Sequence, residues 1–496
     1  MWRDDPATTM TIGWNQVSGH SPMLYFSEVD HGQDVKAYDQ SAIPDREVLA
    51  KGMHNHFVRL TGLYPGTIYY FIIVDTEGVS QRMSFRTAPD HPYERLSIIA
   101  GGDSRNHRTG RRNANRLVSK LRPHCVMFGG DMTGSDRSRE WKAWFDDWQY
   151  TFSSDGRITP LITTRGNHEY SNKTLVDLFD VRNEKIYYAL NLGGSLLRVY
   201  TLNSLIASGG NQKYWLEQDL ADHQHMIWKV AQYHYAIRPH TRSKKERNDQ
   251  YRNWAKAFHQ YQVNMVVESD AHVVKTTWPV SPSSQAGNDE GFIRDDDFGT
   301  VYIGEGCWGA PLRRNNDRKD WTRDSGSFNQ FKWIFVDQDG MEIRTIKTDN
   351  ADMVGEVDPY DIYTPPPGIS IWQPKNGSVI VIPRRSPTIA QSATASVDEM
   401  IPFENTFPSG PSKSSVSSVS TKLKVNKKVE RTTVEITECK ASLSDINIAI
   451  EWKTKNEIDK GINYELQKTI DGKNFKTIAQ IKSAGNTSSK INTYKI

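Results

Sequence analysis

Short apolar stretches, each followed by a polar residue, recur through the middle of the chain. Five of them are predicted to be buried strands, and the residues that follow are of types that bind metal ions. These residues are Asp103, Asp131, Asn167 with His168, His234, and Asp270 with His272. Ligands in α/β sheets bind beyond the carboxyl ends of the strands, so we expect these side chains to converge on one crevice. Glycines in front of Asp103, Asp131 and Asn167 permit the close backbone approach that such a crevice needs.

Each of these signals has an ordinary structural explanation when it stands alone. A Gly-Asp pair after a strand is usually a turn, the Gly-Asn-His-Glu segment at 166–169 fits a hairpin turn, and His234 alone fits a core histidine. The ordered set, with each member at the end of an apolar run, favours a metal centre instead. Carboxylates, an amide oxygen and imidazoles suit Zn, Mn or Fe. A metal ion in such a centre can generate hydroxide near neutral pH.

The elements that must position these residues are of two kinds. Residues 7 to about 88 are predicted to be all-β, and residues from about 95 to about 350 alternate buried strands with helices. Such alternation is typical of a layered α/β domain. The expected strands of the second region are 96–100, 125–128, 160–164, 227–232, 263–267, 332–336 and 342–346, and its expected helices are 112–120, 214–222 and 251–261.

The last third of the chain has a different composition. Residues 384–425 are rich in Ser, Pro, Thr and Lys, which predicts a linker, because such a segment has little apolar surface to bury. Residues 430–496 again show alternating strands and a turn at 471–472, as expected of an incomplete β-sandwich.

The order Gly-Asp, Gly-Asp, Gly-Asn-His-Glu, His and Asp-x-His resembles the calcineurin-like metallophosphoesterase superfamily, in particular its purple acid phosphatase branch. The similarity covers roughly residues 1–350, and the segment 275–280 resembles the one that follows the last histidine in that branch. The turn at 63–69 also resembles the corner of fibronectin type III sandwiches. The implied fold is a multidomain one with a four-layer αββα catalytic domain. The implied domains are a fibronectin III-like N-terminal domain at 1–90, the catalytic domain at 95–350, an extension and linker at 351–429, and the partial, secretion-associated β-sandwich at 430–496.

The resemblance also implies a role for each site residue. Asp103 and His272 would hold one metal ion, Asp131 would bridge both ions, and Asn167, His234 and Asp270 would hold the second. His168 would face the substrate and either stabilise the transition state or protonate the leaving oxygen.

Basic residues follow several of the ligand positions. Arg105 and His240 are expected to contact substrate oxygens, since Arg matches phosphate geometry, and His240 is a second candidate acid. The alternative is that these residues, with Arg108, Arg111, Arg112, Arg165, Arg238, Arg242, Lys244 and Lys245, form a solvated helix face and a charged loop.

Three positions depart from the family pattern. Gly134 stands where the purple branch has Tyr, and Arg105 stands where other members have a His, for which His107 is a substitute at longer spacing. Asp270 replaces the first His of Gly-His-x-His, which adds a negative charge. The cofactors implied are two divalent or trivalent ions, Fe, Mn or Zn, and we expect a preference for Mn or Fe(II) over a ferric–zinc pair and no purple colour.

The implied activity is that of a metal-dependent phosphoric ester hydrolase, in the first place a phosphomonoesterase that uses metal-bound hydroxide. The alternatives are a phosphodiesterase or nucleotidase on the same centre, and a non-catalytic surface binding protein, against which the retained Asn167 and His168 argue. The aromatic residues Trp141, Trp144, Phe145 and Trp148 fit core packing better than a stacking wall for a sugar or base.

The expected partner is a small-molecule phosphoester. The net charge of +3, from 62 basic and 59 acidic residues, does not indicate nucleic acid, and no apolar run approaches the length of a membrane span. No secretory signal is visible at the start, and three distant cysteines do not make a disulfide framework. Segments within 450–475 resemble domains that precede sorting signals in type IX secretion, so the expected location is extracellular or at the cell surface, with secretion machinery or surface attachment through the C-terminal region.

Overall fold

A computed structural model describes residues 1–385 and six strands between residues 423 and 495. The chain divides into two compact units, Met1–Ile401 and Pro402–Ile496. Among the residues described, no helix has the length and apolar character needed to cross a membrane. The expected linker and the expected turn at 471–472 lie almost wholly outside the described residues.

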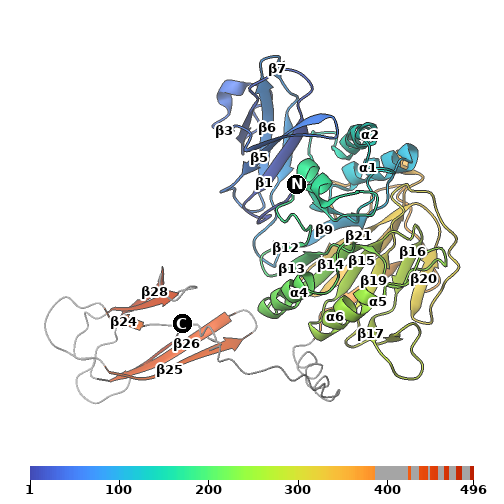
Figure 1. The fold of residues 1–496 in the computed structure, drawn as a ribbon. Coiled ribbons are helices and arrows are strands. Elements are labelled where there is room, and N and C mark those ends of the chain that lie inside the picture. Colours follow the sequence, from blue (N-terminus) through green and yellow to red (C-terminus); the bar gives the residue numbers. More distant parts are fainter. Residues whose placement is uncertain are drawn as a thin grey trace, which may run out of the picture. The chain divides into compact units, whose positions relative to one another are not determined.

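The N-terminal part of the first unit consists of two small antiparallel sheets (Figure 1). One has the order β1 (Met10–Asn15), β5 (Met53–Leu60), β4 (Arg46–Ala50), and the other β3 (Gln40–Ala42), β2 (Met23–Ser27), β6 (Ile68–Asp75), β7 (Gly78–Val79), with β8 (Met83–Arg86) also paired to β6. Apolar residues from both sheets, among them Ile12, Val58 and Phe71, are buried in one core. At the expected corner, the Tyr69 hydroxyl accepts a hydrogen bond of 2.8 Å from the Tyr64 amide.

A six-stranded sheet begins the α/β region. Its order is β11 (Leu161–Thr163), β10 (Cys125–Phe128), β9 (Leu96–Gly101), β21 (Gln330–Val336), β22 (Gly340–Lys347), β23 (Val379–Pro383). Strands β9, β10 and β11 are parallel, and β21 is antiparallel to β9. Because β23 pairs with β22, this sheet extends past residue 350, where the sequence suggested an end. The helices of this half are α1 (Arg108–Leu121), α2 (Ser138–Trp148) and α3 (Asn172–Phe179).

A seven-stranded sheet forms the second half. Its order is β12 (Tyr188–Leu192), β13 (Leu197–Thr201), β14 (Trp228–Tyr235), β15 (Met265–Ser269), β19 (Val301–Gly304), β16 (Val274–Thr277), β20 (Thr322–Gly326), and β13, β14, β15 and β19 are parallel. The hairpin β17 (Val280–Pro282) and β18 (Phe292–Arg294) stands beside it. The helices are α4 (Asn211–Asp222), α5 (Asn248–Gln250) and α6 (Lys256–Gln260), the last two joined by a π-helical turn, Tyr251–Ala255.

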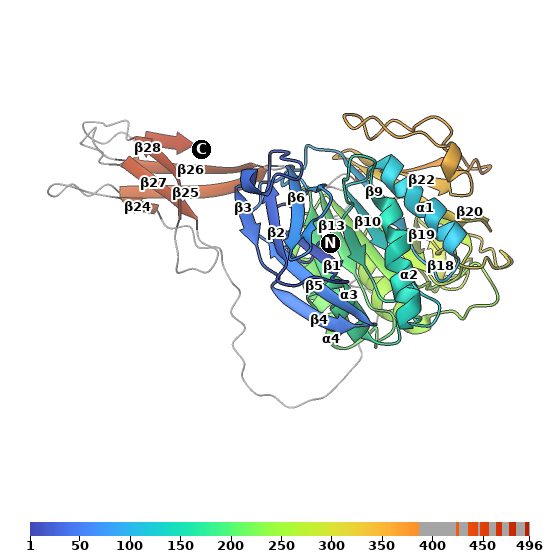
Figure 2. The ribbon, with the colours of Figure 1, turned by 90° about the horizontal axis from the view of Figure 1, so that it is seen from above.

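The alternation of side chains along the strands explains the layering. Ile98 of β9 is buried in the same core as Val230 and Val267 of the other sheet, so the two sheets face each other. Ile99, the next residue of β9, is instead buried with Leu117 of α1. On the far side of the seven-stranded sheet, the alternate residues of β14 and β15 are buried with α4 and α6. The result is the expected four-layer αββα arrangement, with α1 and α2 on one side and α4 and α6 on the other (Figures 1 and 2).

The second unit is described only by its strands. Strands β24 (Leu423–Val425), β27 (Asn463–Lys468) and β28 (Lys476–Lys482) form one antiparallel sheet, and β25 (Glu435–Ser444), β26 (Asn447–Lys455) and β29 (Asn492–Lys495) form another.

A cluster of ion pairs ties the N-terminal sheets to the α/β region. Asp180, at the end of α3, lies 2.7 Å from Arg59 and 3.2 Å from Arg46, both of which come from the β4–β5 pair. The Asp180 side chain is only 4% exposed. Hydrogen bonding to Asp180 raises the pKa of Arg59, although burial opposes it.

Replacing Asp180 with asparagine is expected to lower the free energy of unfolding of the first unit by about 3 kcal/mol, because removal of one partner leaves buried charges uncompensated. Asparagine keeps the side-chain shape and tolerates the left-handed backbone of this position, where φ is 46°. Urea denaturation is the measurement. Asp296→Asn is the matched control: Asp296 pairs with Arg294 at the surface, so its loss should cost under about 1 kcal/mol. Equal losses of unfolding free energy in the two variants would show that the Asp180 cluster stabilises the first unit no more than a surface ion pair does.

Candidate metal centre

The residues predicted to bind metal are brought together by the ends of five parallel strands from both sheets. Asp103, Asp131 and Asn167 follow β9, β10 and β11 of the six-stranded sheet, in loops that lead on into the next elements. His234 is the second-last residue of β14 and does not follow the strand, although the sequence suggested that it would. Asp270 and His272 follow β15. All six are buried or partly buried.

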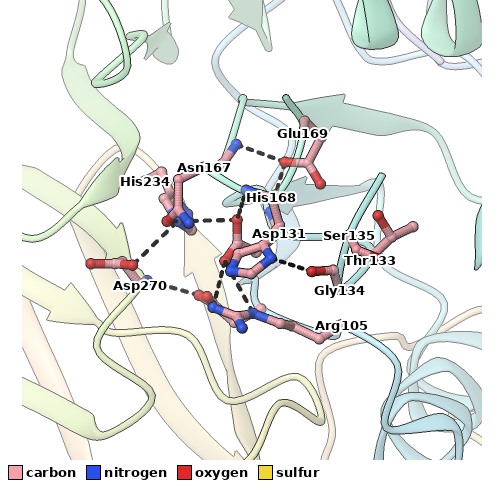
Figure 3. Close-up of polar contacts among 12 residues, drawn as sticks. Arg105, Asp131, Thr133, Gly134, Ser135, Asn167, His168, Glu169, His234 and Asp270 are labelled. Carbon is pink, nitrogen blue, oxygen red and sulfur yellow. Dashed lines mark hydrogen bonds and ion pairs between the residues drawn. The ribbon is translucent and has the colours of Figure 1, made fainter. Parts of the chain in front are cut away.

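Short distances divide these six residues into two groups. In one, His272 Nε2 lies 3.0 Å from Asp103 Oδ1. In the other, His234 Nε2 is surrounded by oxygens, at 3.1 Å from Asn167 Oδ1, 3.3 Å from Asp131 Oδ1 and 3.6 Å from Asp270 Oδ1 (Figure 3). The groups meet because Asp103, Asp131 and His234 each offer a ligand atom within 4.8 Å of the others. Which metal ion each residue would hold stays a prediction.

Both histidines are fixed through their second ring nitrogen. Nδ1 of His234 lies 2.8 Å from the Gly129 carbonyl, and Nδ1 of His272 lies 2.8 Å from the Pro311 carbonyl. A hydrogen bond of this kind sets the tautomer and leaves Nε2 to face the ligand, as is usual for metal-binding histidines. A buried set of carboxylates, an amide oxygen and two oriented imidazoles fits a pair of divalent ions.

The backbone around the site is held in an uncommon conformation. Asp103, Asp131, Asp270 and His272 all have positive φ, between 53° and 69°. Left-handed backbone at a residue other than glycine costs free energy and gathers at functional sites.

The glycines before the ligands permit contact between neighbouring loops. A Cβ atom on Gly130 would lie 2.3 Å from the Gly166 amide nitrogen, and one on Gly166 would lie 2.3 Å from the Asp131 amide nitrogen. Any side chain at either position would push the loops of Asp131 and Asn167 apart.

The charges of the site are strongly coupled. Burial alone would raise the pKa of Asp270, but His234 and Lys244 lower it to about 2. Burial would likewise raise the pKa of Asp131, yet His234, His168 and Arg105 hold it well below its usual range. Burial lowers the pKa of His234, and Asp131, Asp270 and Asp103 outweigh it and raise that pKa well above the usual value. The carboxylates therefore remain ionised and attract positive charge.

Two of the predicted substrate-contacting residues lie at this centre. Arg105 NH2 is 3.2 Å from Asp131 Oδ2. His168 donates its backbone N–H to Asp131 Oδ1 at 2.8 Å, its Nδ1 contacts the Gly134 carbonyl, and its ring remains about one-fifth exposed (Figure 3). With Nδ1 directed at a carbonyl, Nε2 is the atom of His168 that can give or take a proton.

His240, the third residue that was predicted to contact substrate, is fully buried. Its Nε2 lies 2.7 Å from Thr322 Oγ1, and its Nδ1 lies 3.6 Å from Glu305 Oε1. Burial lowers its pKa, against the opposing effect of Glu305. Within residues 1–385, its ring has no hydrogen bond or ion pair to the metal-centre residues. This position gives no support to a contact between His240 and substrate.

Most of the other basic residues have structural partners. Arg108, Arg111 and Arg112 of α1 all bind the buried Asp147 of α2, which fits the alternative of a packed helix face. His107, considered as a replacement ligand, is exposed at the start of α1. Lys244 differs from these residues because its partner belongs to the metal centre: its ammonium contacts Asp270 Oδ1. It supplies positive charge beside the carboxylate that replaces a family histidine.

Gly134 lies against Asn106. Asn106 occupies the space beside Gly134, and a Cβ atom on Gly134 would lie 2.4 Å from Asn106 Nδ2. The Gly134 amide donates to Asn106 Oδ1 at 3.1 Å. A tyrosine at 134 therefore requires a different residue, or a different rotamer, at 106.

Sequence analysis missed Glu169 as a functional residue. Its buried carboxylate accepts hydrogen bonds from the amides of Asp131, Met132 and Gly166, at 2.9, 2.8 and 2.8 Å (Figure 3). Burial and the nearby Asp131 raise its pKa to about 7, against these hydrogen bonds. Its place in the Gly-Asn-His-Glu segment was the available signal. Glu169 holds the Asp131 loop against the Asn167 loop.

Glu169→Gln is expected to lower kcat or metal affinity about 10–100-fold, the usual effect of losing a residue that positions metal ligands. Glutamine has one acceptor oxygen where three amides converge, so its NH2 group must face a backbone N–H. The measurement combines turnover with metal content. Glu342→Gln is the control, because Glu342 of β22 accepts hydrogen bonds from Arg95 and Arg344 and from no residue of the site. Equal effects in both variants would contradict the positioning role.

The aromatic cluster is a core element, as expected. Trp141 and Trp144 are fully buried and belong to the core that includes Phe128, Phe179 and Trp308. Phe145 and Trp148 pack against the same core.

Comparison with known proteins shows similarity in the N-terminal domain and in the fold. Residues 1–87 match the model for the purple acid phosphatase N-terminal domain. The structure of purple acid phosphatase PPD1 from yellow lupin (Lupinus luteus) seeds is similar, with a TM-score of 0.59 and 15% identity over 81% of this chain and 76% of that chain. The structure of PhoD is similar with a TM-score of 0.53 and 11% identity over 78% and 85% of the two chains. Comparison with curated proteins gives no match. Residues 1–87 are thus a purple acid phosphatase N-terminal domain, and the fold of the chain is similar to that of a purple acid phosphatase.

Proposed function

We propose that this chain hydrolyses phosphomonoesters with the help of two metal ions held between its two sheets. The domain match and the fold are those of metal-dependent phosphoesterases. The observation that carries the proposal is the convergence of six ligand side chains in two groups, with Asp131 between them. Ions held there would supply Lewis acidity and lower the pKa of a water molecule that attacks phosphorus.

The surrounding residues have roles that follow from their contacts. Arg105 can bind a phosphoryl oxygen with the part of its guanidinium not engaged by Asp131. His168 Nε2 can donate a proton to the leaving oxygen, because Nδ1 is held at the Gly134 carbonyl. Glu169 keeps the loops of Asp131 and Asn167 in contact while the proton is transferred.

The proposed metals are divalent, Mn or Fe(II) before a ferric–zinc pair. Gly134 offers no phenolate, which is the hard ligand that ferric iron uses in the purple branch. Asp270 adds a carboxylate, and hard oxygen donors favour Mn over softer ions. The contact with Lys244 offsets part of the added charge.

Location and attachment are also proposals. The chain is proposed to act outside the cell or at its surface, with the C-terminal unit serving in secretion or attachment. Fractionation of the source cells, with detection of the chain in medium and envelope fractions, tests this.

The test of function is reconstitution. Protein stripped of metal is supplied separately with Mn, Zn and Fe(II), and hydrolysis of p-nitrophenyl phosphate and of bis-p-nitrophenyl phosphate is measured. Metal-dependent turnover of the monoester, fastest with Mn or Fe(II), is the expected result. Faster turnover of the diester would assign a phosphodiesterase to the same centre, and a failure to bind metal or to turn over either substrate would favour a non-catalytic surface protein.

A further inference from the structure

The N-terminal sheets carry a second cluster of metal-binding side chains, outside the catalytic region. His54 and His56 are two residues apart on β5, so both side chains lie on the same face of the strand. Glu47 of β4 is directly opposite His56 in the register of the two strands. The three residues each offer a ligand atom, and these atoms lie within 4.8 Å of one another.

The distances within this cluster suit a shared ion better than direct hydrogen bonds. Glu47 Oε2 lies 3.6 Å from His54 Nε2, and Glu47 Oε1 lies 3.5 Å from His56 Nδ1. Both separations exceed the normal length of an N–H···O hydrogen bond, about 2.7–3.2 Å. Two ligands of one tetrahedral zinc ion, each about 2.1 Å from the metal, are about 3.4 Å apart.

His56 itself is the second, independent observation. Its side chain is 3% exposed, and within residues 1–385 neither of its ring nitrogens has a hydrogen-bond partner. A buried polar group without a partner costs free energy, on the order of 1–3 kcal/mol. Burial lowers the pKa of His56, partly offset by Glu47, so the ring is held neutral, which is the form that binds metal.

We propose that Glu47, His54 and His56 bind one divalent transition-metal ion of the zinc class, separate from the catalytic pair. Imidazole and carboxylate donors suit this class of ion. Glu47 and His54 are about half exposed, so the ion reaches the site from solvent, and water completes its coordination. The ion joins β4 to β5 and gives a partner to His56. Trp14 of β1 is stacked on His56, with ring centroids 5.5 Å apart, and therefore reports on the site.

Metal content tests the proposal in the full chain. Wild type, Glu47→Gln and His54→Ala are stripped with chelator, dialysed against buffered zinc and analysed for zinc per chain. Both replaced side chains are half exposed, so folding should be unaffected. The expected result is one zinc ion fewer per chain in each variant, with phosphatase turnover unchanged. His91→Ala is the matched control, because His91 forms a pair with Glu94 at 3.5 Å without a second histidine.

Fluorescence gives a second readout that does not depend on catalysis. Copper(II) added to zinc-free protein should quench the emission of Trp14, so the quenched fraction should be smaller in Trp14→Phe and in His54→Ala than in wild type. Equal zinc content in wild type and His54→Ala, or quenching that His54→Ala leaves intact, would overturn the proposal and leave a His–Glu–His charge cluster. Because the site is separate from the catalytic centre, loss of phosphatase activity alone would not affect the result.

Discussion

Asp131→Ala is expected to lower kcat/KM for p-nitrophenyl phosphate by ~10³-fold or more. Asp131 Oδ1 lies near His234 and accepts the amide of His168, and Oδ2 lies near Arg105. Asp131 also offers a ligand atom within 4.8 Å of one from Asp103, so this carboxylate adjoins both ligand groups. Its loss removes the ligand that is proposed to bridge the two ions, and metal ions contribute several kcal/mol to such reactions. About 4 kcal/mol of lost stabilisation corresponds to this factor.

The Asp131→Ala variant must be folded if its loss of turnover is to be attributed to catalysis. Circular dichroism and thermal unfolding check it, and metal content shows which ions remain. Asp297→Ala, at an exposed aspartate, is the control and should retain full turnover. Turnover within tenfold of wild type in folded Asp131→Ala would contradict a centre built around this residue.

His168→Ala has the second largest expected effect, a loss of about 10²–10⁴ in kcat, the range typical of general acid–base catalysis. The loss should depend on the leaving group. Nitrophenolate departs without a proton, so the variant should be impaired less with p-nitrophenyl phosphate than with an alkyl phosphate. The measurement is kcat for both substrates in wild type and variant.

His107→Ala is the matched control, since His107 is exposed at the start of α1. It should change turnover by no more than about twofold, because it has no place in the proposed mechanism. An equal loss for both leaving groups in His168→Ala would exclude proton donation and leave His168 a role in transition-state binding.

The strands and their polar ends could be predicted because they depend on local sequence. Apolar runs of strand length, followed by glycine and then a ligand, give the bounds of β9 and β10 to within a residue. Glycines 130 and 166 were singled out for close backbone approach, and their atoms do come together. The positions of these residues follow from the parallel strands of each sheet, which end at the same edge.

The features that could not be predicted depend on contacts between segments that are distant in the sequence. His240 was placed near substrate because it follows His234 closely in the chain, but its partners, Glu305 and Thr322, are 65 and 82 residues further on. The arginines of α1 share a face that periodicity reveals, whereas their partner Asp147 belongs to another helix. Glu169 is buried by two loops that meet only in the folded protein. No local pattern contains this information.

The two ligand groups each combine residues from both sheets, since Asp103 meets His272 and Asn167 meets His234. The thickness of the apolar layer between the sheets therefore sets the geometry of the centre. Ala100 and Val267 lie in that layer, one from each sheet. An added methylene there costs typically 1–3 kcal/mol of stability, which a folded protein can tolerate. Metal–ligand distances, however, tolerate changes of only about 0.2 Å. Substitutions in this buried apolar layer are therefore expected to change metal binding and turnover, although Ala100 and Val267 are not among the predicted ligands.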